Sequence, residues 1–245
     1  MKRCGILLKN KEYLLPYVSW LLENQDKLNY EITGIHTNDE SWAEENIGHD
    51  WIPRMDFNSI IDSSDLVVSL SYWKKINEQT INKVPMGIVN FHHSYKLKYK
   101  GRHSSTWVIR NGEKKHGSTM HFIDKHLDRG TIIDTDWFDI NEDDTADDVF
   151  HKANETGLTL LKRNFEKVIH GETIKPQEES AVCYEYKESH LNHRLDIKNE
   201  ETLLREIRSL TFHDCPAPYV VLGGKKVFLK MEGYDSGILK GENKC

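Results

Sequence analysis

Short runs of apolar residues recur along the first half of the chain, separated by longer stretches in which polar residues dominate. Four of these runs have the length of buried strands: Cys4–Leu8, Glu31–His36, Leu66–Leu70 and Gly87–Asn90. Strands that alternate with amphipathic segments are typical of βαβ units, whose strands run parallel in one sheet. The pattern therefore predicts an α/β fold with a mostly parallel sheet.

The second half begins with a predicted helix over Ser104–Arg110 and two predicted strands, Ser118–Ile123 and Thr131–Ile140. Apolar residues then recur at helical spacing in a long segment that lies between Thr145 and Gly171. A threonine hydroxyl accepts hydrogen bonds from the first free N–H groups of a helix, and glycine tolerates the left-handed conformation that ends one. The segment is predicted to be one long helix with both ends capped.

The C-terminal part has a different pattern, which begins with a polar linker after Pro176. A helix is predicted over Glu200–Ser209, followed by two strands, Tyr219–Leu222 and Lys226–Met231. The Gly223-Gly224 pair between these strands suits a two-residue hairpin turn, because both residues tolerate a positive φ. We therefore predict a small C-terminal β-hairpin appendage.

The chain has 245 residues, enough for one large domain with a smaller appendage. We place a catalytic domain over residues 1–178 and the helix and hairpin over residues 179–245. A formal net charge of −6 argues against a nucleic-acid partner, because proteins that hold nucleic acid neutralise several phosphates with a basic surface. No segment approaches the run of about 20 apolar residues that spans a membrane, so we expect no membrane partner and a cytoplasmic location.

Several cofactor sites find no support in the sequence. Residues Leu8-Lys9-Asn10-Lys11 follow the first strand without the glycine pattern of a dinucleotide site or a P-loop. The four cysteines are widely spaced with no CxxC pair, which favours free thiols. His116 and His121 have an odd spacing that places them on opposite faces of a strand, so we predict no metal site.

The segment Asn90-Phe91-His92-His93-Ser94 is the richest in chemistry, and it lies where a buried strand meets a polar loop. Open α/β sheets build their sites at the carboxyl ends of strands. Alternation along the strand sends Asn90 and His92 to the same face. An amide that donates to a developing oxyanion and an imidazole that handles a proton suit acyl transfer to an amine.

A carboxylate is still needed beside the imidazole, to fix its orientation and favour its protonated form. Asp124 and Asp128 are the two candidates. Asp128 comes just before a tight loop with Gly130, where its side chain can turn inward, whereas Asp124 ends a strand and suits a ligand contact.

A family resemblance extends this hypothesis. Six short sequence elements carry this resemblance. In chain order they are Asn90-Phe91-His92-His93-Ser94, Tyr99-Lys100-Gly101-Arg102, Trp107, Asn111-Gly112-Glu113, Gly117-Ser118-Thr119-Met120-His121 and Leu127-Asp128-Arg129-Gly130-Thr131-Ile132. These elements resemble the core pattern of the folate-dependent formyltransferase superfamily, which includes glycinamide ribonucleotide formyltransferase and methionyl-tRNA formyltransferase. The likeness is close over about residues 86–133.

The resemblance implies a Rossmann-like formyltransferase domain that takes its formyl group from 10-formyltetrahydrofolate and needs no metal. The implied catalytic set is Asn90, His92 and Asp128. The implied folate pocket is formed largely by backbone, at Ser71, Tyr72, Trp73, Met86, Gly87, Ile88, Asp124 and His126.

The C-terminal pattern Ile207–Phe212 and Cys215–Tyr219 is similar to sugar N-formyltransferases that act on dTDP-linked amino sugars. Those enzymes often pair through a hairpin, so a homodimer is expected. The resemblance favours dTDP-4-amino-4,6-dideoxyglucose as acceptor, for bacterial surface polysaccharide such as the O-antigen of lipopolysaccharide. The expected acceptor contacts are Lys9, Asn10, Lys74, His93, Ser94, Tyr95, Arg102 and Phe212.

Four alternatives remain at this point. Methionyl-tRNA formyltransferase would need a longer, basic C-terminal domain, and glycinamide ribonucleotide formyltransferase usually carries a Gly/Ser-rich loop where Lys9-Asn10-Lys11 stands. A formyl-folate hydrolase would use the same triad with water as acceptor. A catalytically silent folate- or sugar-nucleotide-binding module would bind without turnover.

Overall fold

A six-stranded sheet organises the molecule, with strand order β2-β1-β3-β4-β6-β7 in this computed structural model. The structure describes residues 1–47, 52–185, 191–197, 199–213 and 215–233. The strands are β1 (Lys2–Leu8), β2 (Tyr30–Thr37), β3 (Leu66–Leu70), β4 (Ile88–His92), β6 (Lys115–Phe122) and β7 (Ile132–Asp139). Strands β1 to β4 pair in parallel, and β6 runs antiparallel to both β4 and β7. The predicted α/β fold with a mostly parallel sheet is confirmed.

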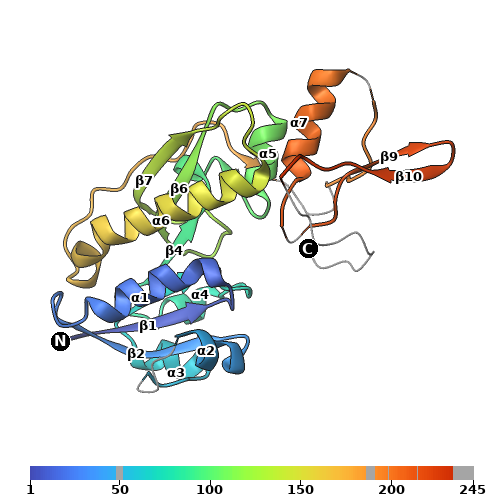
Figure 1. Ribbon diagram of the computed structural model, residues 1–245. Coiled ribbons are helices and arrows are strands. Elements are labelled where there is room, and N and C mark those ends of the chain that lie inside the picture. The colour runs from blue at the N-terminus through green and yellow to red at the C-terminus, as the bar shows by residue number, and fades with distance from the viewer. Residues whose placement is uncertain (48–51, 186–190, 198, 214, 234–245) are drawn as a thin grey trace.

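Helices cover both faces of the sheet (Figure 1). They are α1 (Leu15–Glu23), α2 (Glu40–Ile47), α3 (Phe57–Ser63), α4 (Glu78–Ile81), α5 (Ser104–Arg110), α6 (Ala146–Ile169) and α7 (Glu200–Leu210). Two short 3₁₀ turns lie at Glu12–Leu14 and Tyr95–Leu97. Helices α1 and α6 contribute to the larger apolar core, and α3 packs in a second core on the opposite face.

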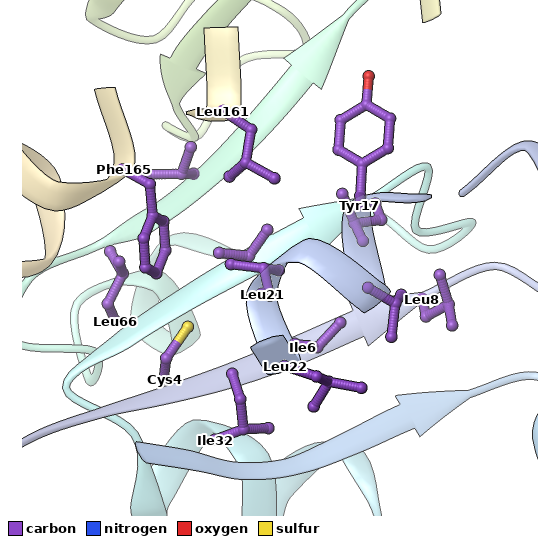
Figure 2. Close-up of a cluster of buried hydrophobic side chains, with 14 of the residues drawn as sticks. Cys4, Ile6, Leu8, Tyr17, Leu21, Leu22, Ile32, Leu66, Leu161 and Phe165 are labelled. Atoms are coloured by element: carbon purple, nitrogen blue, oxygen red, sulfur yellow. The ribbon is translucent and has the colours of Figure 1, made fainter. Parts of the chain in front are cut away.

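The larger core explains why the apolar runs of the first half become central strands. Figure 2 shows Ile6 and Leu66 of β1 and β3 beneath Leu21 of α1 and the α6 residues Leu161 and Phe165. All five side chains are fully buried. Central parallel strands are covered on both faces, so they read as continuous apolar runs in the sequence.

Helix α6 has the ends that the sequence predicts. The Thr145 hydroxyl accepts from the Asp148 N–H at 3.2 Å, and the Asp148 carboxylate accepts from the Thr145 N–H at 2.8 Å. This reciprocal pair satisfies two backbone groups that no helical bond reaches. At the other end Gly171 has a φ of +67°, a conformation that glycine adopts without steric cost.

The C-terminal region projects from the sheet beside α5 (Figure 1). It contains α7 and a hairpin of β9 (Tyr219–Leu222) and β10 (Lys225–Phe228), joined by Gly223 and Gly224, both with positive φ. The chain reaches this region through a short parallel pairing of β5 (Tyr99–Lys100) with β8 (Tyr184–Glu185). The predicted hairpin is therefore present, while the boundary after residue 178 stays a prediction.

Two other expectations concern cysteines and membranes. Cys4, Cys183 and Cys215 are free thiols, and Cys245 lies outside the described residues. Within the described ranges, no helix combines the length and the apolar character that a bilayer crossing requires.

Candidate active site

A cleft of about 770 Å³ opens at the carboxyl ends of the parallel strands. Its lining includes Lys9 after β1, Ser71 after β3, and Asn90 and His92 at the end of β4. Parallel strands direct their carboxyl ends to one edge, so side chains far apart in the sequence meet there. The sequence predicts this location.

Asn90 is held by a histidine on the neighbouring strand. Asn90 and His121 are opposite one another in the β4–β6 pairing, and the Asn90 Nδ2 lies 3.3 Å from His121 Nε2. His121 Nδ1 lies 2.9 Å from the Phe122 carbonyl oxygen, which only accepts, so Nδ1 carries the proton. A neutral His121 then accepts from the Asn90 amide, and the second N–H of that amide is left for another acceptor.

Burial keeps His121 neutral. Desolvation lowers the pKa of His121 to about 4, although the nearby Asp128 carboxylate acts in the opposite direction. Burial likewise lowers the pKa of His93 to about 3, with a further contribution from the neighbouring His92. Both rings therefore serve as neutral groups near pH 7.

His92 is oriented by a backbone carbonyl. Its Nε2 donates to the Tyr99 oxygen at 2.6 Å, and the Asp128 Oδ2 lies 3.7 Å from the same nitrogen. Both side chains are mostly buried, with 12% and 9% of the His92 and Asp128 side chains exposed. Asp128 thus lies beside the His92 ring, while Tyr99 supplies the direct hydrogen bond.

Asp128 turns inward because of its backbone. Its φ is +51°, which aspartate adopts more readily than most residues, and its Oδ2 accepts from the Gly101 N–H at 2.8 Å. Two residues later, a Cβ at Gly130 would stand 1.7 Å from the Phe122 oxygen. Only glycine fits there, which fixes the loop that carries Asp128 against the end of β6.

The residues predicted to contact folate separate into two groups. Ser71, Tyr72, Trp73, Asp124 and His126 line the cleft, and the Asp124 Oδ1 accepts from the His126 N–H at 2.7 Å. Met86, Gly87 and Ile88 do not line it. Met86 packs on the larger core, Gly87 has a φ of +83° before β4, and Ile88 is fully buried.

The residues predicted to contact the acceptor also fall into two groups, those that line the cleft and those that do not. Lys9, Lys74, His93, Arg102 and Phe212 line the cleft. Asn10, Ser94 and Tyr95 do not. The Asn10 N–H donates to Asn38, the fully buried Ser94 hydroxyl accepts from the Tyr99 N–H at 2.7 Å, and the Tyr95 ring lies under the Lys96 ammonium.

Sequence reasoning missed several lining residues. His121, Tyr13, Phe150 and His213 all face the cleft. His121 lies opposite Asn90 in the pairing of β4 with β6. The sequence alone does not give the register of that pairing, so it could not identify His121. Phe150 lies on α6 at helical spacing and is indistinguishable there from a core position.

A group of possible metal ligands lies at one side of the cleft. Asp147, His151 and His213 offer ligand atoms within 4.8 Å of one another, and Asp147 is hydrogen-bonded to His213. Asp147 also donates its N–H to the Thr211 carbonyl at 3.2 Å. These contacts join the start of α6 to the segment after α7.

The fold and the cleft define an α/β protein with a cleft at the carboxyl ends of its parallel strands. Residues 61–165 match the family model described as formyl transferase. The predicted family resemblance is thereby confirmed. Methionyl-tRNA formyltransferase of Clostridium tetani is 28% identical over 149 residues, which cover 58% of this chain and 48% of that protein. The chain spans about half the length of such curated relatives.

Solved structures share the whole fold. A 4-N formyltransferase from Francisella tularensis superposes with a TM-score of 0.80 at 17% identity, covering 94% of this chain and 97% of that one. The N-formyltransferase of Helicobacter canadensis, solved with folinic acid and dTDP-3-aminofucose, gives a TM-score of 0.72 at 22% identity, covering 93% and 86%. At such identities the likeness establishes the fold, and the architecture is that of a formyltransferase.

Proposed function

We propose that this protein transfers a formyl group from 10-formyltetrahydrofolate to the amino group of a nucleotide-linked amino sugar. The observation that carries the proposal is the convergence of an amide, an imidazole and a carboxylate, from Asn90, His92 and Asp128, on one cleft of a formyl transferase domain. That cleft is large enough for a drug-sized ligand or more.

Asn90 acts on the formyl oxygen. The sugar amine attacks the formyl carbon, and the carbonyl oxygen gains negative charge as the new C–N bond forms. His121 holds one N–H of the Asn90 amide, so the other is fixed in direction before the substrate arrives. A donor fixed in this way stabilises an oxyanion without reorganising during the reaction.

His92 manages the proton. With its Nε2 proton directed at the Tyr99 carbonyl, the neutral ring has Nδ1 as its basic nitrogen. It takes a proton released by the attacking amine, and a proton reaches N10 of the folate as the C–N10 bond breaks. The Asp128 carboxylate favours the imidazolium that forms in between.

The two ends of the cleft suit the two substrates. Tyr72, Trp73 and the Asp124–Asp128 loop form the proposed folate end. Lys9 and the aromatic group around Phe212 form the proposed acceptor end, where cations meet a pyrophosphate and a ring stacks on a pyrimidine. The Helicobacter canadensis enzyme, solved with folinic acid and dTDP-3-aminofucose, supports this pairing of ligands.

We further propose dTDP-4-amino-4,6-dideoxyglucose as the acceptor, which would place the enzyme in bacterial surface polysaccharide synthesis. The similarity to a 4-N formyltransferase supports amine position 4, and the complex with a 3-amino sugar makes position 3 the natural comparison. An assay with acceptors that carry the amine at C3 or at C4 separates the two positions.

The test is a mass-spectrometric screen with 10-formyltetrahydrofolate and purified protein. Acceptors are dTDP-linked and UDP-linked sugars with the amine at C3 or C4, methionyl-tRNA, and buffer alone. A gain of one formyl group on an amino sugar supports the proposal. Formylated methionyl-tRNA would instead support the activity of the curated relatives, and formate release in buffer alone would identify a hydrolase.

A further inference from the structure

The buried Lys100 contacts Asp128 of the proposed catalytic set and takes no part in the proposed chemistry. The Lys100 side chain is 1% exposed, and its Nζ donates to the Asp128 carbonyl oxygen at 2.9 Å and to Glu179 Oε2 at 2.8 Å. A buried ammonium requires an opposite charge and satisfied hydrogen bonds. Glu179 supplies the charge, and Asp128 supplies a backbone acceptor.

Three consecutive residues of β5 and its end contact His92 and Asp128. The Tyr99 carbonyl accepts from His92, Lys100 donates to the Asp128 carbonyl, and the Gly101 N–H donates to the Asp128 carboxylate. Because these groups are adjacent in the chain, a shift of one moves the others. Residues 99–101 therefore set the separation of the imidazole and the carboxylate.

The segment that contains Glu179 is fixed along the same loop. The Ser180 N–H donates to the Lys96 carbonyl at 2.9 Å, and the Tyr184 N–H donates to the Lys98 carbonyl at 2.7 Å. The Tyr184 ring also stacks on Tyr99 with centroids 5.1 Å apart. Glu179 thus reaches Lys100 from a segment that is itself anchored to the loop.

We propose that Lys100, with Glu179 holding its charge, is a positioning residue that keeps Asp128 in its left-handed backbone conformation beside His92. The conformation of Asp128 is sparsely populated outside glycine, so it persists only where the surroundings hold it. Lys100 binds the carbonyl of that residue directly. The inference rests on the proposed function, since it assigns a purpose to Asp128 in that reaction.

The decisive experiment compares Lys100→Met with the double variant Lys100→Met/Glu179→Leu. The single variant leaves a carboxylate without its buried partner, so it loses both stability and turnover. The double variant removes both charges, which restores stability because an apolar pair replaces the ion pair. It does not restore the donor to the Asp128 carbonyl, so kcat stays lower by about tenfold to a hundredfold, while KM changes by less than about threefold.

Two further variants complete the set. Lys100→Arg keeps a charged donor and should recover most of the turnover that Lys100→Met loses. Lys98→Met is the matched control, because Lys98 lies in the same loop and pairs with Glu113 at 2.6 Å. Its turnover should stay near the wild-type value.

A second readout does not depend on turnover. Hydrogen exchange of the Gly101 amide reports its bond to the Asp128 carboxylate, and it should be at least about tenfold faster in the double variant, with the sheet unchanged. Wild-type exchange at Gly101, or full turnover in the stable double variant, would overturn the positioning role. Absence of formyl transfer in the wild type would refute the proposed function alone, because the exchange measurement would still decide the role of Lys100.

Discussion

The two walls of the cleft are built in different ways. On the wall formed by β4, β6 and the 124–130 loop, polar side chains are bound by other groups of the protein: Asn90 by His121, His92 by Tyr99, and Asp128 by Gly101. A second wall brings Tyr13, Phe150 and Phe212 together from three separate segments through edge-to-face ring contacts.

This difference has a chemical meaning. Hydrogen bonds fix direction, which a wall that stabilises a transition state requires. Ring contacts provide apolar contact area and tolerate small rearrangements, which suits a wall that recognises one acceptor among similar ones. We infer that changes on the first wall alter kcat and that changes on the second wall alter KM.

The largest expected effect comes from His92→Gln. The glutamine amide has neither the proton affinity nor the charge of an imidazolium, so turnover should fall by about a hundredfold to ten-thousandfold, with the acceptor KM little changed. Steady-state kinetics of the formyl transfer would measure this. His170→Gln, an exposed change at the end of α6, is the control. Retained turnover in His92→Gln would remove His92 from the mechanism.

Asn90→Ala tests the same wall with a smaller expected loss. Removal of one donor to a developing oxyanion costs about a hundredfold to a thousandfold in kcat. Because Asn90 is directed by His121, a His121→Leu variant should reproduce part of this loss while Asn90 itself remains. A wild-type kcat for Asn90→Ala would show that the oxyanion is held elsewhere.

Acid should destabilise the protein through three histidines near the first wall, of which His116 and His121 are buried and His93 is partly buried. Burial lowers the pKa of His93 and His116 to about 3 and that of His121 to about 4. The unfolded chain binds these protons near pH 6.5, so the free energy of unfolding falls as pH drops from 6.5 to about 4. The expected slope is about 1 kcal/mol per pH unit for each histidine.

Chemical denaturation at several pH values would measure that slope, and His116→Leu provides the comparison. His116 is 1% exposed between the rings of Tyr99 and Phe138. Its removal should reduce the number of protons linked to unfolding by about one. An unchanged slope would show that His116 is not buried as a neutral ring.

These residues also show what the sequence could predict. Continuous apolar runs located the central strands, which are buried on both faces, and apolar residues at helical spacing located α6, which is buried on one face. The position of Asn90 and His92 at the end of a predicted strand identified them as candidate catalytic residues. In the sequence Lys100 cannot be told from a solvated surface lysine, because its partner Glu179 lies 79 residues further along the chain. Only the folded chain brings such pairs together, and no local pattern records them.

Phe212→Ala tests the second wall. The ring centroids of Phe212 and Phe150 lie 5.2 Å apart, and Phe212 lines the cleft. Removal of the Phe212 ring therefore removes a surface on which a base would stack. The acceptor KM should rise about tenfold with kcat nearly unchanged. A fall in kcat at constant KM would assign Phe212 to the first wall and contradict the division of roles between the two walls.

The smallest effect on turnover is expected outside both walls, at the hairpin. We propose that the hairpin pairs with a second copy of the chain, because Val221, Leu222, Val227 and Phe228 leave 39–53% of their surface exposed on it. The strand register places Val221 and Phe228 on one face of the hairpin, and exposed apolar side chains that share a face mark an interface. Phe228→Glu should convert a dimer to a monomer in sedimentation analysis, whereas Lys225→Glu, on the same hairpin, should not. Since none of these residues lines the cleft, turnover per subunit should persist, and a monomeric wild type would remove the hairpin from this role.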